Sequence, residues 1–242
     1  MSRGHGWVTD FVSAVIVCFN RWDLTAKCYK SILESDDLPD EIVFVDNHST
    51  DQTPEMLATF GQAGIPIQVA TLSENVGWGR GANIGAQLAE GEYLLHLNND
   101  TEVQPGWLTA LVNEMKDDTA VVAGRLTNPD GSLQHAGITL YHDSNGTYTA
   151  ENIRTEQTAG DADAVSLAAA LCRADAWHEL GGVDPRYFCG YEDVDYSLRA
   201  LRAGWRVVYT PNSTVMHHGS ASGPTRWAHT QDNIRLLHER WG

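Results

Sequence analysis

The chain alternates between apolar runs and amphipathic stretches through its first hundred residues. Residues 12–19 are a near-continuous apolar run rich in β-branched side chains, which is typical of a strand buried on both faces, and residues 41–46 are a second such strand. Residues 67–71 and 93–97 are expected to be two further strands. Helical spacing of apolar residues follows over 23–35, and residues 80–89 read as a further helix. Thr53-Pro54 is a helix start. This alternation predicts an α/β fold with a Rossmann-like, mostly parallel sheet flanked by helices.

The second half of the chain is less regular. We expect helices over 107–116, 174–180 and 227–240, a strand over 120–126, and a strand over 206–209 that Pro211 stops. Turn signals at 128–131 and at Asn145-Gly146 make residues 127–160 a loop-rich region, and residues 165–172 fit either a strand or a helix. With no repeat and no linker, residues 1–242 are predicted to form a single domain.

The net charge of the chain limits the classes of partner that it is expected to bind. Thirty-two acidic residues outnumber sixteen basic ones, for a net charge of −16. Such a surface repels the DNA backbone and anionic lipid headgroups, although a local basic patch can override net charge. A nucleic-acid partner is therefore disfavoured but stays open, and an adaptation for solubility or salt is the favoured interpretation of the acidity.

Localisation is expected to be cytoplasmic, and a peripheral position at the membrane stays open. No apolar run approaches the roughly 20 residues that a membrane span needs. Residues 1–10 lack a signal-peptide core, and the four cysteines have no metal-binding spacing, which fits reduced thiols. Two of the four glycosylation sequons lie in the candidate site below, where a glycan would block it.

Polar side chains follow the predicted strands. Asn20, Asp46 and the Asn98-Asn99-Asp100 turn each come directly after an apolar run, and ligands in such sheets bind beyond the carboxyl ends of the strands. Asp100 is suited to a divalent cation bound to a nucleotide diphosphate, and Asn98 to the ribose or to a metal-bound water. The alternative is a plain turn, because Asn and Asp both favour turns.

A glycine-rich segment, residues 75–85, follows the third strand and opens a helix. Its backbone N–H groups could face an anion, with Arg80 adding positive charge. The spacing is not GxGxxG and there is no P-loop lysine, so a dinucleotide-binding role is weakly supported. Close helix packing is the other interpretation, and it is also weakly supported for three glycines together.

Three carboxylates fall within residues 192–195, at the start of a predicted helix. Acidic residues are favoured there by the helix dipole, so capping is one interpretation. The other is catalysis: Asp193 could be the general base toward an acceptor hydroxyl, with Glu192 beside it raising one pKa of the pair. Charge alone does not decide between the two residues. His217 could bind a metal or be a hydrogen-bonded structural histidine.

These residues, in this order, resemble family 2 glycosyltransferases with the GT-A fold, and within them the group of rhamnosyltransferases and galactofuranosyltransferases. The resemblance runs from about residue 12 to residue 222 and rests on seven segments: VSAVIVCFNR, EIVFVDNHSTDQT, ENVGWGRGANIGA, GEYLLHLNNDTEVQPGWL, GSLQHAG, ELGGVDPRYFCGYEDVDYSLRALRAGWRVVYTP and MHHGSAS. It implies a nucleotide-sugar-binding half over about 12–100, an acceptor-binding and catalytic half over about 101–222, and a C-terminal helix over 225–242.

The resemblance also implies roles for individual residues. Asp46 would contact the base of the donor, with Asn20 and Asn75 in the same donor site. Arg80 and Asn83 would lie near the nucleotide and its diphosphate. The metal-binding DxD motif of the family appears as Asn98-Asn99-Asp100, with its last carboxylate kept.

The same resemblance implies the metal ligands, the catalytic base and the reaction. Asp100 and His217 would be the metal ligands, for Mn²⁺ or Mg²⁺, and Asp193 would be the base within the Glu192-Asp193 pair. The expected activity is inverting transfer of a sugar from a UDP- or dTDP-sugar to a carbohydrate or glycolipid acceptor, in polysaccharide or glycolipid assembly. Two alternatives stay open: an acceptor that is a modified nucleic-acid base or a peptide, and a non-catalytic module that binds sugar nucleotides. The oligomeric state is not readable from the sequence.

Overall fold

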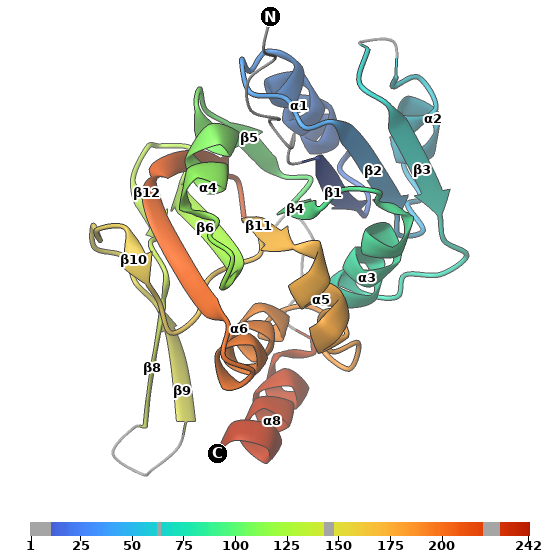
Figure 1. The fold of residues 1–242 in the computed structure, drawn as a ribbon. Helices are drawn as coiled ribbons and strands as arrows, with labels where there is room; N and C mark the ends of the chain where they lie inside the picture. The colour runs from blue at the N-terminus through green and yellow to red at the C-terminus, as the bar shows by residue number, and fades with distance from the viewer. Residues whose placement is uncertain (1–10, 62–63, 143–147, 220–227) are drawn as a thin grey trace, which may run out of the picture.

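The computed structural model describes residues 11–61, 64–142, 148–219 and 228–242, which form one mixed α/β domain (Figure 1). Its elements, in chain order, are β1 (Val12–Cys18), α1 (Trp22–Leu33), β2 (Glu41–Asp46), α2 (Thr53–Leu57), β3 (Ile67–Thr71), α3 (Trp78–Leu88), β4 (Tyr93–Leu97), β5 (Thr101–Val103), α4 (Trp107–Glu114), β6 (Thr119–Thr127), β7 (Leu133–His135), β8 (Ile138–His142), β9 (Tyr148–Asn152), β10 (Gly160–Asp161), β11 (Ala169–Arg173), α5 (Ala174–Leu180), α6 (Glu192–Arg202), β12 (Arg206–His217) and α8 (Thr230–Trp241).

A single large sheet runs through the domain in the order β10-β12-β6-β11-β4-β1-β2-β3. Strands β4, β1, β2 and β3 are parallel, as the alternating pattern of the first hundred residues predicts. Strand β11 is antiparallel to both of its neighbours, and β12 is again parallel to β6. The ambiguous segment 165–172 is therefore resolved as a loop followed by a strand, and the mostly parallel sheet flanked by helices is confirmed.

Helices cover both faces of this sheet (Figure 1). Helices α1, α2 and α4 contribute to one core with the apolar side chains of β1, β4 and β6, including Ile16 and Trp107. Helices α3, α5 and α6 lie on the other face, where Trp177 and Tyr196 belong to the second core. Every residue of β1 and β2 is buried, because both faces of these strands are covered.

The glycine-rich segment lets α3 approach β1 closely. A Cβ atom on Gly81 would lie 2.8 Å from Val17 Cγ1, and one on Gly85 would collide with Val15. Gly77, with φ +83°, begins the helix, where the N–H of Trp78 donates to the carbonyl of Phe188 (2.9 Å). Packing of the helix therefore explains these glycines, which was one of the two interpretations of the sequence.

Residues 127–160 contain more structure than the loop-rich expectation allows. The turn at 128–131 forms, with the N–H of Gly131 donating to the carbonyl of Asn128 (2.9 Å). After it come β7, the β8–β9 hairpin and β10. The hairpin packs its apolar side chains, Leu140 among them, against Val194 of α6 and Leu237 of α8. Strands this short are stabilised by tertiary packing, which a local pattern does not record. The Asn145-Gly146 signal lies outside the described residues.

Pro211 does not end the last strand, so that expectation was wrong. Strand β12 continues to His217, and its register with β6 shifts between Thr210 and Thr214. Proline lacks the N–H that a regular ladder needs but is tolerated at such an irregularity. The continuation matters for function because it carries His217 to the edge of the sheet where β4 ends.

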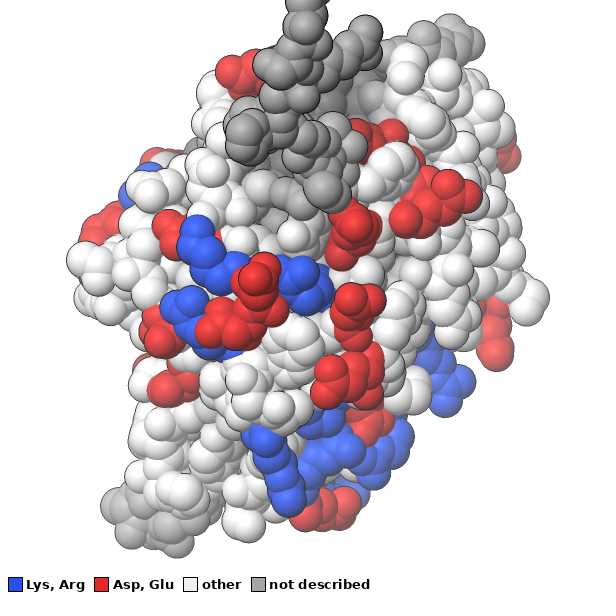
Figure 2. Space-filling model, in the orientation of Figure 1, with Lys and Arg blue, Asp and Glu red and all other residues white. Residues whose placement is uncertain are grey.

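Acidic side chains are spread over the face seen in Figure 2, whereas basic ones gather over α6 and α8 and beside α4. Within the described residues, no helix is long and apolar enough to cross a membrane. Cys18, Cys28 and Cys172 are buried thiols, and burial raises the pKa of Cys28 to about 12.

Candidate active site

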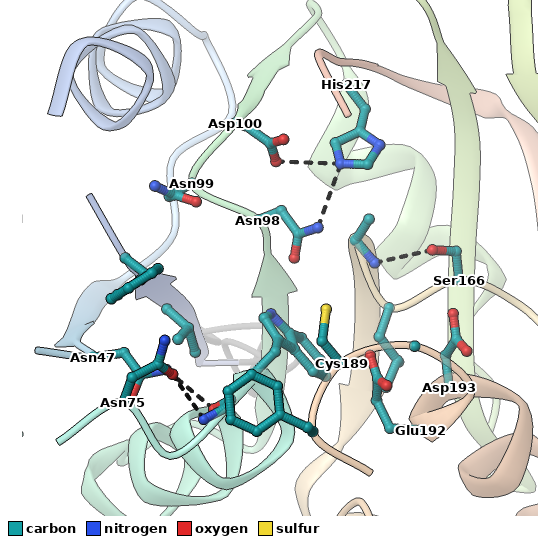
Figure 3. A pocket seen from close by; sticks show the side chains of 18 residues that line it. Asn47, Asn75, Asn98, Asn99, Asp100, Ser166, Cys189, Glu192, Asp193 and His217 are labelled. Carbon is teal, nitrogen blue, oxygen red and sulfur yellow. Dashed lines mark hydrogen bonds and ion pairs between the residues drawn. The ribbon is translucent and has the colours of Figure 1, made fainter. Parts of the chain in front are cut away.

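An open pocket lies at the carboxyl ends of the parallel strands (Figure 3). Its wall combines residues that follow β1, β2 and β4 with the loop before β11, the loop before α6 and the end of β12. The lining residues are Val17, Phe19, Asn47, Asn75, Gly77, Trp78, Asn98, Asn99, Asp100, Ser166, Leu167, Ala168, Phe188, Cys189, Gly190, Glu192, Asp193 and His217. Six of the ten site residues predicted from the sequence line this pocket: Asn75, Asn98, Asp100, Glu192, Asp193 and His217.

Asp100 and His217 face each other on one side of this pocket. The antiparallel pairing of β5 with β12 sets Thr101 opposite His217, and it leaves 3.2 Å between Asp100 Oδ1 and His217 Nε2. Asn98 Nδ2 lies 3.4 Å from the same nitrogen. Both Asp100 and His217 are buried. One carboxylate and one imidazole are a suitable partial ligand set for a divalent cation.

The rest of the Asn98–Asp100 turn supports this pair. Asn99 Nδ2 donates to Thr25 Oγ1 of α1 (2.9 Å), and Thr101 Oγ1 donates to the carbonyl of Asn98 (2.7 Å). Among the residues that the structure describes, no group of three or more His, Cys, Asp or Glu side chains could hold a metal. A cation at this point would therefore take its remaining ligands from a bound substrate and water.

Glu192 and Asp193 lie across the pocket from His217, at the start of α6 (Figure 3). Tyr191 precedes them with φ 70°, so the chain turns sharply into the helix at this point. Asp193 Oδ1 accepts the N–H of Val194 (2.9 Å), and Glu192 is buried. The pocket therefore has a carboxylate pair on one side and a potential cation site on the other.

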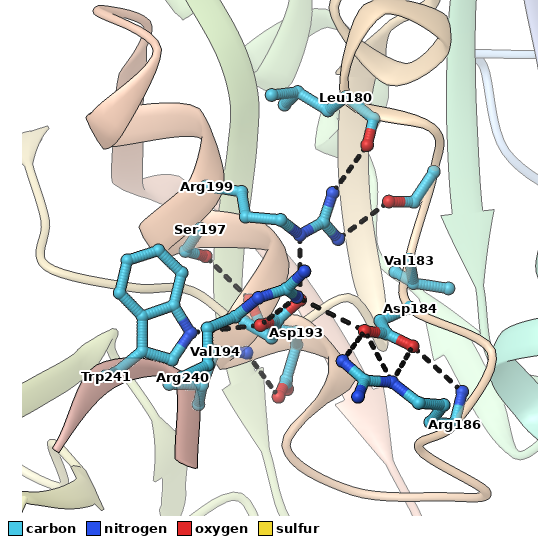
Figure 4. Close-up of polar contacts among 12 residues, drawn as sticks. Leu180, Val183, Asp184, Arg186, Asp193, Val194, Ser197, Arg199, Arg240 and Trp241 are labelled. Atoms are coloured by element: carbon cyan, nitrogen blue, oxygen red, sulfur yellow. Dashed lines mark hydrogen bonds and ion pairs between the residues drawn. The ribbon is translucent and has the colours of Figure 1, made fainter. Parts of the chain in front are cut away.

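The third carboxylate of the segment, Asp195, faces away from the pocket. It is buried and accepts hydrogen bonds from Arg199 Nε (2.8 Å), from the Arg240 guanidinium (2.9 Å) and from Trp241 Nε1 (3.0 Å). Arg199 also donates to the carbonyl of Leu180 (2.7 Å) (Figure 4). Through these hydrogen bonds Asp195 links α8 to α6.

Helix α8 also holds the loop that forms one wall of the pocket. Asn233 is buried, and its Nδ2 donates to the carbonyls of Cys189 and Gly190, both at 2.9 Å. The ring of His229 stacks on Phe188 with the centroids 4.3 Å apart. Helix α8 and His229 before it thus hold Phe188, Cys189 and Gly190, which precede Tyr191 and the carboxylate pair.

Two predicted site residues lie beside the pocket rather than in it. Asp46 is buried; its Oδ1 accepts the N–H of Ser49 (3.0 Å), and its Oδ2 has no hydrogen-bond partner within the described part of the chain. Asn20 Oδ1 accepts the N–H of Thr50 (2.8 Å), while the N–H of Asn20 donates to Ser49 Oγ (2.8 Å). Asn20 therefore joins the loops that follow β1 and β2.

Arg80 and Asn83, on α3, do not line the pocket. Asn83 uses both ends of its amide on the backbone of Val183: Nδ2 donates to the carbonyl (2.8 Å) and Oδ1 accepts the N–H (3.1 Å). Arg80 is exposed. Asn75, in contrast, does line the pocket, and its Oδ1 accepts from Asn47 Nδ2 (2.9 Å) and from the N–H of Gly77 (3.0 Å).

Several residues of the pocket wall were not predicted from the sequence. Asn47 is 2% exposed and stands directly after Asp46, so its place after a buried strand was an available signal. The loop of Ser166 to Ala168 had no such signal. It is held by His135, whose Nε2 accepts the N–H of Ser166 (3.2 Å); burial lowers the pKa of His135 to about 4, so the ring is neutral.

A second pocket adjoins the first and shares Cys189, Gly190 and Asp193 with it. Its other lining residues come from the β8–β9 hairpin and the segment after it, the start of α6 and the start of α8: Ile138, Ala150, Glu151, Asn152, Arg154, Tyr191, Val194 and Thr230. Asp193 therefore lies where the two pockets meet, whereas Glu192 lines the first pocket alone.

Curated relatives match most of this chain. An O-antigen biosynthesis protein RfbC of Myxococcus xanthus is 33% identical over 229 residues, which are 88% of this chain but 18% of that protein. An N-acetylglucosaminyl-diphospho-decaprenol L-rhamnosyltransferase of Mycobacterium tuberculosis is 26% identical over 243 residues, with 89% of this chain and 78% of the relative covered. The chain thus spans less than a fifth of one relative and most of the other.

Solved structures share the fold at lower identity. GalNAc-T7 superposes with a TM-score of 0.69 and 19% identity over 88% of this chain and 44% of that one. The mannosyltransferase PcManGT of Pyrobaculum calidifontis gives 0.66 and 17% identity over 95% of this chain and 61% of that one. The GT-A fold expected from the sequence is therefore confirmed.

A family model described as glycosyl transferase family 2 matches residues 13–175. The matched range covers β1 to the start of α5 and so includes the strand ends that carry Asn47 and Asp100. The carboxylate pair and His217 lie beyond it, on elements that complete the same pocket. With a parallel sheet, a pocket at its carboxyl edge and this match, the chain belongs to glycosyltransferase family 2.

Proposed function

We propose that this protein transfers a sugar from a nucleotide-diphosphate donor to an acceptor hydroxyl with inversion at the anomeric carbon. The observation that carries the proposal is one pocket with two opposed functional sides: the Glu192-Asp193 pair and the Asp100–His217 pair. An in-line displacement needs this arrangement, because the base must act on the side opposite the leaving diphosphate.

The Asp100–His217 pair fits a divalent cation such as Mn²⁺ or Mg²⁺. When bound, the cation would stabilise the charge that develops on the leaving diphosphate. Asp100 would supply a carboxylate oxygen and His217 its Nε2, and Asn98 Nδ2 is close enough to donate to an oxygen beside them. Two structures of the same fold are described with Mn²⁺, GalNAc-T7 with UDP and GalNAc and the Pyrobaculum enzyme with GDP-mannose, which supports this assignment.

Asp193 is the base that we assign, because it lies where the two pockets meet. A donor sugar in the first pocket and an acceptor in the second would meet at this carboxylate. The hydrogen bond from the N–H of Val194 fixes its orientation (2.9 Å). Asp193 would remove the proton of the acceptor hydroxyl as the new glycosidic bond forms, while Glu192 would line the donor side.

The donor is proposed to be a UDP- or dTDP-sugar. Uracil and thymine present an imide N–H, which a carboxylate can accept. Asp46 Oδ2 is a buried acceptor with no partner in the described residues, and the neighbouring Asn47 lines the pocket. A buried unpaired acceptor is costly unless a ligand satisfies it, which supports Asp46 as the base-recognising residue.

The acceptor is proposed to be a carbohydrate or glycolipid that enters through the second pocket. That pocket mixes polar side chains, Glu151, Asn152 and Arg154, with the aromatic ring of Tyr191. Such a mixture suits sugar hydroxyls. The mycobacterial relative is named for a sugar acceptor on a diphospho-decaprenol lipid, which supports the same class.

The test is the turnover of nucleotide-sugars by Asp193→Asn. We expect transfer to fall by a factor of about 10² to 10⁴, which is the usual contribution of a general base, while donor binding is retained. Asp175→Asn is the matched control, because Asp175 is also in the first turn of a helix but is exposed on α5. Transfer at the wild-type rate in Asp193→Asn would refute the assigned base.

A further inference from the structure

Gln134, on β7, contacts the ring and the backbone of His217 but does not line the pocket. Its Nε2 lies 3.0 Å from the carbonyl oxygen of His217 and 2.9 Å from Asn128 Oδ1. Its Oε1 lies 2.6 Å from His217 Nδ1. Although β7 pairs with β6 and not with β12, this single side chain therefore ties β7 to the last residue of β12.

These contacts identify the nitrogen and the oxygen of the Gln134 side-chain amide. A backbone carbonyl can only accept a hydrogen bond, so the atom of Gln134 that faces the His217 carbonyl must be the NH₂ group. The other end is then an oxygen, which can only accept. The atom of the His217 ring that meets this oxygen at 2.6 Å must therefore carry a hydrogen, and that atom is Nδ1.

A hydrogen on Nδ1 of His217 determines the state of the other ring nitrogen, Nε2. In a neutral imidazole only one nitrogen carries a hydrogen, so a protonated Nδ1 leaves a lone pair on Nε2. That nitrogen faces Asp100 Oδ1 at 3.2 Å and Asn98 Nδ2 at 3.4 Å. In the opposite tautomer, Nε2–H would donate to Asp100, and this hydrogen bond would occupy both of the atoms that a cation needs.

We propose that Gln134 is a positioning residue that holds His217 in its Nδ1–H tautomer and so keeps the Nε2 lone pair available to a divalent cation. The role in cation binding rests on the proposed function, whereas the tautomer does not depend on it. A hydrogen-bond partner behind a metal-binding histidine commonly sets both the ring orientation and the tautomer.

The tautomer can be measured without any metal or substrate. Protein labelled with ¹⁵N at histidine gives long-range ¹H–¹⁵N spectra in which the two tautomers have different patterns, and the loss of one pattern in His217→Ala assigns this residue. At about pH 8 we expect Nδ1–H in the wild type, because Nδ1 faces the side-chain oxygen of Gln134. In Gln134→Leu we expect a shift to Nε2–H. A wild-type ring that carries its hydrogen on Nε2 or on both nitrogens, or no change in Gln134→Leu, would overturn the proposal.

Cation binding is tested with Mn²⁺ alone, by the electron paramagnetic resonance signal of the free ion. Gln134→Leu should weaken Mn²⁺ binding by about 10- to 100-fold, as other substitutions behind metal-binding histidines do. Gln134→Glu should keep wild-type affinity, because a carboxylate still accepts from Nδ1. Gln87→Leu is the matched control on the exposed face of α3 and should change nothing.

The comparison of Leu with Glu separates positioning from packing. Both variants lose the two hydrogen bonds that Gln134 Nε2 donates, so a purely structural role predicts equal weakening in both. Equal weakening would therefore overturn the proposal. If the wild type holds Nδ1–H but binds no Mn²⁺, the role in cation binding falls together with the proposed metal site. If it binds Mn²⁺ with the expected order of variants but transfers no sugar, the proposed function alone fails.

Discussion

Acidification from pH 8 to pH 5 should destabilise the native state through His96, a buried residue of β4. Its ring lies 4.2 Å from the ring of Trp177 and 5.9 Å from that of Trp78, measured between centroids. Burial lowers the pKa of His96 to about 3, and neither ring nitrogen has a hydrogen-bond partner within the described residues. The folded protein therefore holds this imidazole neutral throughout that pH range.

The size of the effect follows from proton linkage. An unfolded histidine titrates near pH 6.5, so below that pH the unfolded state binds a proton that the native state does not. The free energy of unfolding therefore falls as the pH is lowered through 6.5. The loss from His96 alone reaches about 2 kcal/mol at pH 5 and grows by about 1.4 kcal/mol for each further unit until the native pKa is reached.

Urea unfolding of the wild type and of His96→Leu at pH 8 and pH 5 isolates this contribution. Leucine fills a similar volume without polar atoms, so at pH 8 the two proteins should differ by less than about 1.5 kcal/mol. Between pH 8 and pH 5 the wild type should lose about 2 kcal/mol more than the variant. His135 and the carboxylates are present in both proteins, so their titration cancels in the difference. An equal loss in both proteins would refute the reasoning.

Three further predictions concern the parts of the fold that support the pocket. Asp195→Asn should lower the free energy of unfolding by about 3 kcal/mol, measured by urea denaturation, because it removes the charge that Arg199 and Arg240 share. Gly81→Ala should cost about 1–3 kcal/mol in the same assay, since its Cβ would lie 2.8 Å from a methyl group of β1; an unchanged midpoint would contradict this contact. Asn233→Ala should speed amide hydrogen exchange in residues 188–191 while α1 exchanges as before, because two hydrogen bonds to that loop are lost.

The parallel half of the sheet was predictable because three of its strands, β1, β2 and β4, are buried throughout. Each of these is a short apolar run that ends in a polar residue or is followed by one, as β2 ends in Asp46, and helices are needed to connect parallel neighbours. The second half was less predictable. Strands β8 and β9 exist because they pack on α6 and α8, which are distant in sequence, and β12 passes through Pro211 at an irregularity of its ladder.

The site was predictable where its residues stand directly after strands or at a helix start. Asp100, Asp193 and His217 line one pocket, as the sequence analysis expects. The two carboxylates Asp193 and Asp195 could have been separated by helical phase, because residues two apart point to nearly opposite sides of a helix. Gln134 could not have been found, since its importance lies in a contact between two strands that are not neighbours in the sheet.

One measurement tests most directly whether the pocket holds a nucleotide-sugar and a cation together: the melting temperature with UDP-, dTDP-, GDP- and CMP-sugars, each with and without Mn²⁺. A ligand at about 100 times its dissociation constant stabilises the native state by about 2.7 kcal/mol, which raises the melting temperature of a chain of this size by roughly 5–10 °C. The account predicts such a rise with a UDP- or dTDP-sugar, a further rise with Mn²⁺, and loss of the Mn²⁺ effect in His217→Ala. No rise with any of the four, or a rise that ignores both Mn²⁺ and His217→Ala, would contradict it.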